Sequence, residues 1–439
     1  MRTVLALGIV VLLAANAPCL ANDQDYGLCT AEGASADQKF EACTRVIDNA
    51  SESDTHKAAA YGSRGNAWQA KHEYDKAIAD YDQAIALDPK LAKAYNNRGL
   101  ASQAKGDTDR AIADYDQAIA LDPKMAKAYN NRCNAWRDKG DYDRAIADCD
   151  QAITLDPKYA VAYSNRGNAW AEKHEYDRAI ADYDQAIALD PKYAKAYNNR
   201  GQARRATDDV DGAIVDFDQA IALNPKYVEA YNNRGNALRE KEAYEKAIAD
   251  YDQATALDPK YARAYIGRGI AWQAKGDTDR AIAEYDQGIT LDPKRADAYR
   301  RRGISFLFDD NTEKAQADFA QAVEKAPGNP YHAIWLMIAK KANEVSIDAG
   351  AAEKNLDMSK WPAPIVKMLE GEGSPADVKP ADGNRDQQCE AAFYVGAGYQ
   401  LSDQKQEAIK QYRAAVEGCP RQAVERDAAR LGLRQLGEQ

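Results

Sequence analysis

The chain has 439 residues, 45% of them hydrophobic and 29% charged, and its 69 acidic residues outnumber its 58 basic residues to give a net charge of −11. This acidic balance provides no electrostatic footprint for nucleic acid. After Ala21 no apolar run is long enough to span a bilayer. We therefore expect neither a nucleic-acid partner nor an integral membrane span.

The N-terminal segment 1–21 has the pattern of a secretory signal peptide. Arg2 precedes the apolar run 4–15, and Cys19-Leu20-Ala21 fits a small-residue cleavage site. We predict that this segment is removed and that the mature protein is exported, to the periplasm of a Gram-negative bacterium. Lipid attachment at Cys19 is disfavoured because Pro18 stands where a lipoprotein signal has a small residue.

Six cysteines remain after this signal, and they fall into three local pairs. An exported protein can keep disulfides, so we predict Cys29–Cys43, Cys133–Cys149 and Cys389–Cys419. For the middle pair, two buried free thiols are the alternative. The sequence has no Cys-x-x-Cys and its four histidines are scattered, so we expect no metal site and no cofactor.

Between positions 58 and 329 a sequence motif that opens with a tyrosine recurs at a constant spacing, without insertion or deletion. In each unit an alanine and then a proline stand at constant distances after the opening tyrosine. In the second unit, helices are predicted over 92–105 and 108–121, with a Gly-Asp turn between them. Such a period indicates stacked helix pairs, which favours binding over catalysis. The tyrosines that open the motif are Tyr61, Tyr95, Tyr129, Tyr163, Tyr197, Tyr231, Tyr265 and Tyr299.

The residues of one unit closely resemble the tetratricopeptide repeat (TPR) family. The pattern is carried by Tyr95, Gly99, Ala111, Tyr115 and Pro123, and it recurs through 58–329. The resemblance implies an all-α fold, a right-handed TPR superhelix (α-solenoid) of eight regular repeats. Before it, residues 22–57 are predicted to form an N-terminal cap with a half-repeat, whose single helix covers 40–47.

The period breaks after residue 329. We predict a helical connector over 330–370, with helices at 331–342 and 361–369, then a linker over 371–388. One more TPR-like hairpin and a capping helix follow over 389–439, because Gly396, Ala408, Tyr412 and Pro420 return at the expected spacing. The repeat before the break carries apolar residues at 306–308, and we expect that end to pack on this C-terminal region.

Three C-terminal stretches resemble the family of the bacterial lipoprotein NlpI. They are Asn-Pro-Tyr-His-Ala-Ile-Trp-Leu-Met-Ile-Ala at 329–339, Trp-Pro-Ala-Pro-Ile-Val at 361–366 and Glu-Ala-Ala-Phe-Tyr-Val-Gly at 390–396. The resemblance implies a cell-envelope adaptor that docks peptidoglycan hydrolases or a periplasmic protease and forms a homodimer. The chain departs from that family in its longer repeat array and in Cys19.

The candidate binding site is a ladder of asparagines, one in each of five consecutive repeats. In TPR solenoids their helix face lines the concave groove, and amides can pair with the main chain of an extended peptide. A similar ladder lines the TPR groove of the O-linked N-acetylglucosamine transferase. The alternative is that duplication of the repeats copied ordinary solvated amides that have no role in binding. The proposed groove residues are Asn97, Asn131, Asn165, Asn199 and Asn233, with Lys93, Lys127 and Lys195 one turn earlier.

The arginine after each ladder position is interpreted as structural, paired with aspartates such as Asp80 and Asp82 of neighbouring helices. No catalytic arrangement stands out, so we do not expect an enzyme. The sequence favours a periplasmic TPR scaffold that binds peptide segments of envelope proteins. A secreted effector or a self-assembling structural protein is the alternative.

Overall fold

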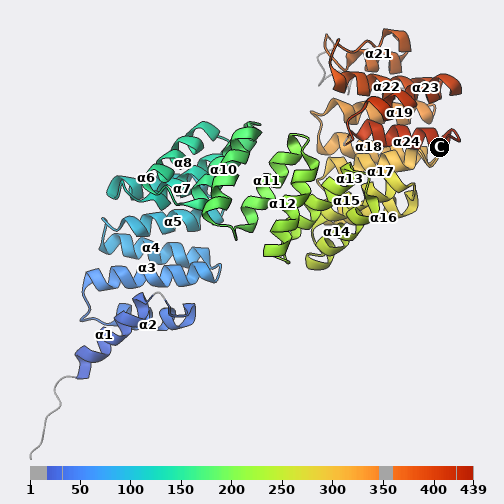
Figure 1. The fold of residues 1–439 in the computed structure, drawn as a ribbon. Helices are drawn as coiled ribbons and strands as arrows, with labels where there is room; N and C mark the ends of the chain where they lie inside the picture. The colour runs from blue at the N-terminus through green and yellow to red at the C-terminus, as the bar shows by residue number, and fades with distance from the viewer. Residues whose placement is uncertain (1–16, 32, 346–358, 422, 439) are drawn as a thin grey trace, which may run out of the picture. The chain divides into compact units, whose positions relative to one another are not determined.

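The structure is a computed structural model and describes residues 17–31, 33–345, 359–421 and 423–438. Within these residues it contains 23 α-helices, one 3-10 helix and no strand (Figure 1). The all-α class predicted from the sequence is confirmed. Most of the predicted signal peptide, residues 1–16, lies outside the described residues, and its predicted end falls within the first helix.

The chain divides into two compact units, residues 1–196 and 197–439. Unit 1 begins with a hairpin of α1 and α2, where the sequence predicted a lone helix, and continues as consecutive helix pairs in which each helix packs on the next. Helix α11 contains the division. The helices up to it are α1 (Ala17–Thr30), α2 (Ala36–Asp48), α3 (Asp54–Ala70), α4 (Tyr74–Leu87), α5 (Ala92–Ala104), α6 (Thr108–Leu121), α7 (Ala126–Asp138), α8 (Tyr142–Leu155), α9 (Ala160–Glu172), α10 (Tyr176–Leu189) and α11 (Ala194–Ala206).

Unit 2 continues the helix pairs and ends in the C-terminal hairpin. The connector predicted at 331–342 and 361–369 is seen as α19 and α21, and the last hairpin begins at Arg385, four residues before its predicted start. Its remaining helices are α12 (Val210–Leu223), α13 (Val228–Glu240), α14 (Tyr244–Leu257), α15 (Ala262–Lys275), α16 (Thr278–Leu291), α17 (Ala296–Leu307), α18 (Thr312–Lys325), α19 (Pro330–Ala342), α21 (Ala363–Glu370), η1 (Pro375–Asp377), α22 (Arg385–Leu401), α23 (Lys405–Gly418) and α24 (Val424–Gln435).

In all the regular pairs except α7 with α8, a glycine on the first helix lies against an aromatic ring on the second. A Cβ added to Gly99 would stand 2.7 Å from Cε1 of Tyr115, and Gly201 has the same relation to Phe217. The turn between α5 and α6 is also set by local residues: Gly106 has a left-handed φ of 86°, and the Asp107 side chain accepts the N–H of Arg110 to cap the next helix. Local sequence therefore sets both the spacing and the direction of the pair.

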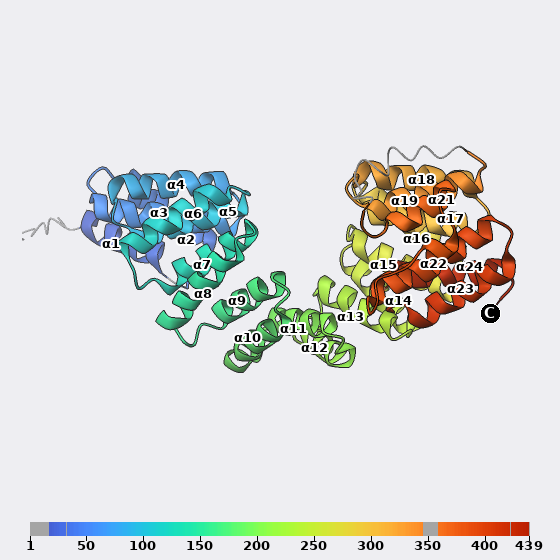
Figure 2. The same ribbon diagram turned by 90° about the horizontal axis from the view of Figure 1, so that it is seen from above.

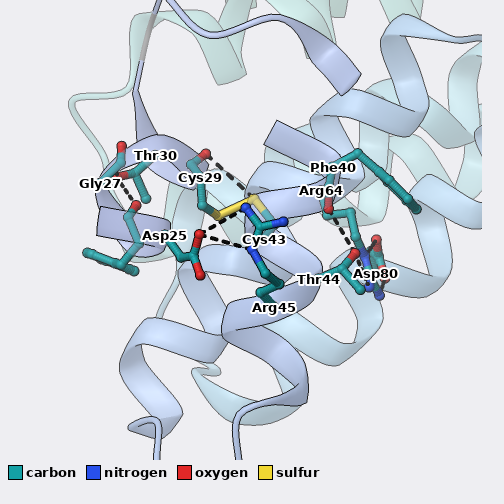
Figure 3. The surroundings of a disulfide bond; sticks show 11 residues. Asp25, Gly27, Cys29, Thr30, Phe40, Cys43, Thr44, Arg45, Arg64 and Asp80 are labelled. Carbon is teal, nitrogen blue, oxygen red and sulfur yellow. Dashed lines mark hydrogen bonds and ion pairs between the residues drawn. A yellow bond between two sulfur atoms is a disulfide. The ribbon is translucent and has the colours of Figure 1, made fainter. Parts of the chain in front are cut away.

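Three disulfides join the cysteines in the pairs that the sequence favours. Cys133 and Cys149 replace the glycine and the aromatic residue of the third regular pair, and their Cα atoms are 5.5 Å apart. Cys29–Cys43 links α1 to α2, and Cys389–Cys419 links the start of α22 to the end of α23. Figure 3 shows the Cys29–Cys43 bond between the two helices of the N-terminal hairpin.

The largest apolar cluster of the described residues lies in the C-terminal part of unit 2. Trp335 of α19, Phe393 of α22 and Tyr412 of α23 are buried in it. Ile304 and Leu307 of α17 belong to the same cluster, with Phe306 and Phe308 packed against it. The expected packing of the last regular repeat on the C-terminal region is therefore confirmed.

Candidate peptide-binding face

The five ladder asparagines occupy equivalent positions on the first helices of successive pairs. Each is half-buried. They are Asn97 on α5, Asn131 on α7, Asn165 on α9, Asn199 on α11 and Asn233 on α13. We call the part of this ladder that lies in unit 1, with Lys93, Lys127 and Lys195 one turn before a ladder position, the asparagine face.

Ladder amides are tied to the preceding repeat by hydrogen bonds. Nδ2 of Asn131 donates to Oδ1 of Asn96 at 2.9 Å, and Nδ2 of Asn165 donates to Oδ1 of Asn130 at 2.9 Å. In unit 2, Asn233 donates to Asn198 at 3.0 Å. The ladder therefore joins neighbouring repeats, a structural role that sequence analysis missed.

The acceptors of these bonds are the buried first members of the Asn-Asn doublets. Asn96 and Asn130 are 7% and 5% exposed. Asn96 also donates to Oδ1 of its neighbour Asn97 at 3.0 Å, and Asn198 does the same to Asn199 at 3.2 Å. An amide has two N–H groups and two lone pairs, so these bonds use part of the capacity of each ladder residue. The recurring Asn-Asn doublet was the sequence signal from which these bonds between repeats could have been predicted.

The lysines of the asparagine face are exposed cations. Lys93, Lys127 and Lys195 stand one helical turn before Asn97, Asn131 and Asn199. Among the described residues, none of the three has an ion-pair partner. Their side chains are therefore available to an anionic or carbonyl-rich ligand.

The arginines that follow the ladder asparagines belong to the frame of the solenoid. Arg98 forms a two-bond fork with Asp114 of its own pair, at 2.9 and 2.5 Å, and reaches Asp82 of the preceding pair at 2.6 Å. The fork with Asp114 raises the pKa of Arg98, which stays charged. The same fork joins Arg64–Asp80, Arg132–Asp148, Arg166–Asp182, Arg200–Asp216, Arg234–Asp250 and Arg302–Asp318.

At the N-terminal end of the array the arginine uses a hydroxyl in place of the second aspartate. Arg64 donates to Oγ1 of Thr44 on α2 at 3.2 Å while it forms the fork with Asp80 (Figure 3). The pairing of Asp80 and Asp82 with these arginines agrees with the structural interpretation of the sequence. The N-terminal hairpin is thereby joined to the first regular pair.

In unit 2 the last helix, α24, lies against the first helices of the repeats. Its arginines recur every four residues and so share one side of the helix. Arg426 and Arg430 both donate to Oε1 of Glu242, at 2.9 and 2.7 Å, and the bond from Arg430 lowers the pKa of Glu242. Arg434 donates to the carbonyl oxygen of Ala274 at 2.8 Å. Helix α24 contacts α15, and Figure 2 shows α24 beside α22 and α23.

This contact covers the ladder position of the eighth repeat. Arg301 stands where five repeats have asparagine, and its Nη1 lies 3.8 Å from Oδ2 of the buried Asp427 on α24. On its other side, α24 packs on α23, where Gly432 lies against the ring of Tyr412. The predicted capping helix thus also occupies part of the repeat face in unit 2. Within the described part of unit 1, no helix of that unit covers the ladder positions of α5, α7 and α9 in this way.

No helix in the described residues is both long and apolar enough to cross a membrane. Within the same residues, no group of three or more histidine, cysteine or acidic side chains is arranged to hold a metal ion. The side chains of the asparagine face are amides and ammonium groups, which can form hydrogen bonds and ion pairs.

Two family profiles match the repeats. One, described as TPR repeat, matches residues 65–106, 167–207, 201–239 and 235–276, and the other, described as tetratricopeptide repeat, matches 96–160 and 266–330. Together they cover more than half of the chain. No curated protein sequence matches the chain significantly.

Several solved structures match the chain. The APC/C hetero-tetramer Cut9-Hcn1 has a TM-score of 0.52 at 16% identity, over 73% of this chain and 62% of that one. MamA matches at 28% identity with a TM-score of 0.34, over 38% of this chain and 96% of its own. YrrB, described as a TPR protein with an unusual peptide-binding site, matches at 25% identity with a TM-score of 0.35, over 44% of this chain and 97% of its own.

Proposed function

Because the chain belongs to the tetratricopeptide repeat proteins, we propose that it is a non-enzymatic scaffold that binds partner proteins through extended peptide segments. The asparagine face of unit 1 is the binding surface. One observation carries this proposal: half-buried amides, with hydrogen-bonding capacity to spare, stand beside exposed lysines that have no ion-pair partner among the described residues. An extended peptide presents carbonyl oxygens and N–H groups at regular intervals, and amides can bind both.

More specifically, we propose that the protein is an adaptor of the bacterial cell envelope, similar to NlpI. Three disulfides support export to an oxidising compartment, which we propose to be the Gram-negative periplasm after removal of residues 1–21. Peptidoglycan hydrolases and a periplasmic protease are the partner classes that the C-terminal resemblance suggests. The same resemblance suggests a homodimer, which sedimentation velocity on the mature chain would detect.

A crosslinking pull-down from envelope extract tests the binding surface. The test variant reverses three charges on the asparagine face, Lys93→Glu, Lys127→Glu and Lys195→Glu. The matched control reverses three exposed lysines that follow the prolines of the same array, Lys124→Glu, Lys158→Glu and Lys192→Glu. Both carry the same change in net charge, so nonspecific electrostatics affects them equally.

We expect partners of the wild type to be lost from the test variant and kept by the control. Lysine variants are preferable to Asn131→Ala or Asn165→Ala, because the asparagine changes also remove bonds between repeats. If the test and control variants recover the same amounts of partner proteins, the asparagine face is not the binding surface.

A further inference from the structure

The asparagine face of unit 1 has a positive end. Three of its helices have a lysine in the first turn: Lys93 on α5, Lys127 on α7 and Lys195 on α11. Helix α5 contains no carboxylate, and the only ones in α7 and α9 are Asp138 and Glu172, the last residue of each helix. Both lie at the opposite end of the face, about 16 Å away along the helix axis.

The groups around these lysines do not cancel their charge. Each turn before a first helix contains one aspartate and one lysine, such as Asp122 and Lys124 before α7, and adds no net charge. The aspartates of the second helices are engaged in the frame, where Arg132 binds both Asp148 and Asp116. The free N–H groups of a helix N-terminus add partial positive charge to that of the lysine. This end of the face therefore attracts an anionic segment.

The fourth regular repeat departs from the row of lysines. Val161 of α9 stands at the position that holds Lys127 in the repeat before it and Lys195 in the repeat after it. It is 38% exposed. A single exposed valine is ordinary on a protein surface. Here, however, it interrupts a charged row on a face that is otherwise repeated from helix to helix.

A tyrosine makes the surroundings of Val161 more apolar. Tyr193 precedes α11, is half-buried, and its side chain interacts with that of Ser164 on α9. Ser164 follows Val161 by three residues, so the two lie on the same side of the helix. The ring of Tyr193 therefore lies along that side of α9. We call Val161 and Tyr193 the apolar spot.

We propose that the segment bound by the asparagine face is acidic and has an apolar residue that packs on the apolar spot, with carboxylates bound by Lys127 and Lys195 on either side. This inference rests on the proposed function and adds the chemistry of the ligand to it. Carboxylates complement the charge of the lysines, and an apolar side chain against Val161 and Tyr193 is removed from water.

The apolar spot also gives the bound segment a register. Amides and lysines that recur identically in successive repeats bind a uniform acidic segment equally well when it is shifted by one repeat. A ligand residue that fits only at α9 removes this degeneracy, because every other register places it against a lysine. The departure at Val161 is therefore the feature that selects one alignment of the ligand.

Fluorescence anisotropy at low salt on the full mature chain tests this proposal with two labelled peptides of equal charge. In one peptide two leucines are flanked on each side by four aspartates, and in the other two serines replace the leucines. We expect the wild type to bind the leucine peptide at least fivefold more tightly. Val161→Lys restores the regular row, so it should bind the serine peptide more tightly than the wild type does and prefer leucine by less than twofold.

The matched control is Val215→Lys, which makes the same change on α12 of unit 2, outside the asparagine face. Val215 is 64% exposed, and this variant should keep the preference of the wild type. Lys127→Glu with Lys195→Glu should weaken binding of both peptides at least tenfold. Lys124→Glu with Lys158→Glu makes the same change in net charge and should stay within twofold. All the replaced residues are exposed, so these changes leave the packing of the helices intact.

Three results would overturn the proposal: no binding of the leucine peptide to the wild type, equal affinity for the two peptides, or a preference for leucine that Val161→Lys and Val215→Lys affect alike. The pull-down with the variant at positions 93, 127 and 195 separates this failure from that of the proposed function. If partners are lost from that variant while the peptides fail, the face binds partners and only the proposed ligand chemistry is wrong. If neither test responds, the proposed function is also wrong.

Discussion

The two aspartates that bind Arg98 should differ greatly in what they contribute to stability. The Asp114 side chain is 5% exposed and forms the fork with Arg98, whereas the Asp82 side chain is 43% exposed and accepts a single bond from Arg98. Removing one partner of a buried ion pair leaves an uncompensated charge and costs about 3 kcal/mol. An exposed pair contributes less than about 1 kcal/mol. We therefore expect Asp114→Ala to be the more destabilising change by about 2 kcal/mol or more.

Amide hydrogen exchange measures this difference locally, which matters because a repeat array does not unfold in a single step. For Asp114→Ala we expect the most protected amides of α5 and α6 to exchange about 100-fold faster, since about 1.4 kcal/mol corresponds to a factor of ten. For Asp82→Ala we expect a change of less than about fivefold. The next repeat provides an internal replicate, with Asp148 and Asp116 around Arg132. Equal effects of the buried and the exposed aspartate would refute the reasoning from burial.

Three further predictions concern the pairs, the disulfides and the C-terminal cluster. Gly99→Ala should lower the melting temperature, at a cost of about 1–3 kcal/mol, because its Cβ would meet Tyr115, while Gly62→Ala, with nothing within 4 Å, should not; similar shifts would contradict the packing argument. Replacing both Cys133 and Cys149 with alanine should lower the free energy of unfolding in urea by on the order of 3 kcal/mol, because the disulfide constrains a loop of the unfolded chain. An unchanged unfolding midpoint would show that the loop was not constrained. Burial lowers the pKa of His332, so the unfolded chain binds its proton first and stability should fall as pH drops below about 6.5; a His332→Asn variant that keeps the same slope of stability against pH would assign the effect to other groups.

Most of the repeat architecture could be predicted because its determinants are local. Gly99 and Tyr115 belong to one helix pair, and the fork of Arg98 with Asp114 spans the same short interval of sequence. The constant period of the array shows the residues of such contacts again and again, so the helix pairs, their turns and the structural arginines followed from the sequence. The cysteine pairs are local in the same sense.

Contacts between distant segments could not be predicted in this way. The docking of Arg430 on Glu242 joins positions far apart in the chain, and it depends on the path of α19, α21 and α22, where the period is broken. The hydrogen bonds from Asn131 to Asn96 were missed for another reason: an amide on a helix surface suits either water or a neighbour, and only the packing of first helices decides between them. The asparagines of the candidate site therefore also have a structural role, because they join neighbouring repeats.

Site-specific photo-crosslinking tests the central claim, that partners lie along the asparagine face of unit 1. A photoreactive amino acid placed at Lys127, on that face, and in a separate variant at Lys158, in the exposed turn before α9, would be irradiated with envelope extract. The account predicts discrete crosslinked partners from position 127 and none of them from position 158. The same partners from both positions, or from position 158 alone, would contradict it.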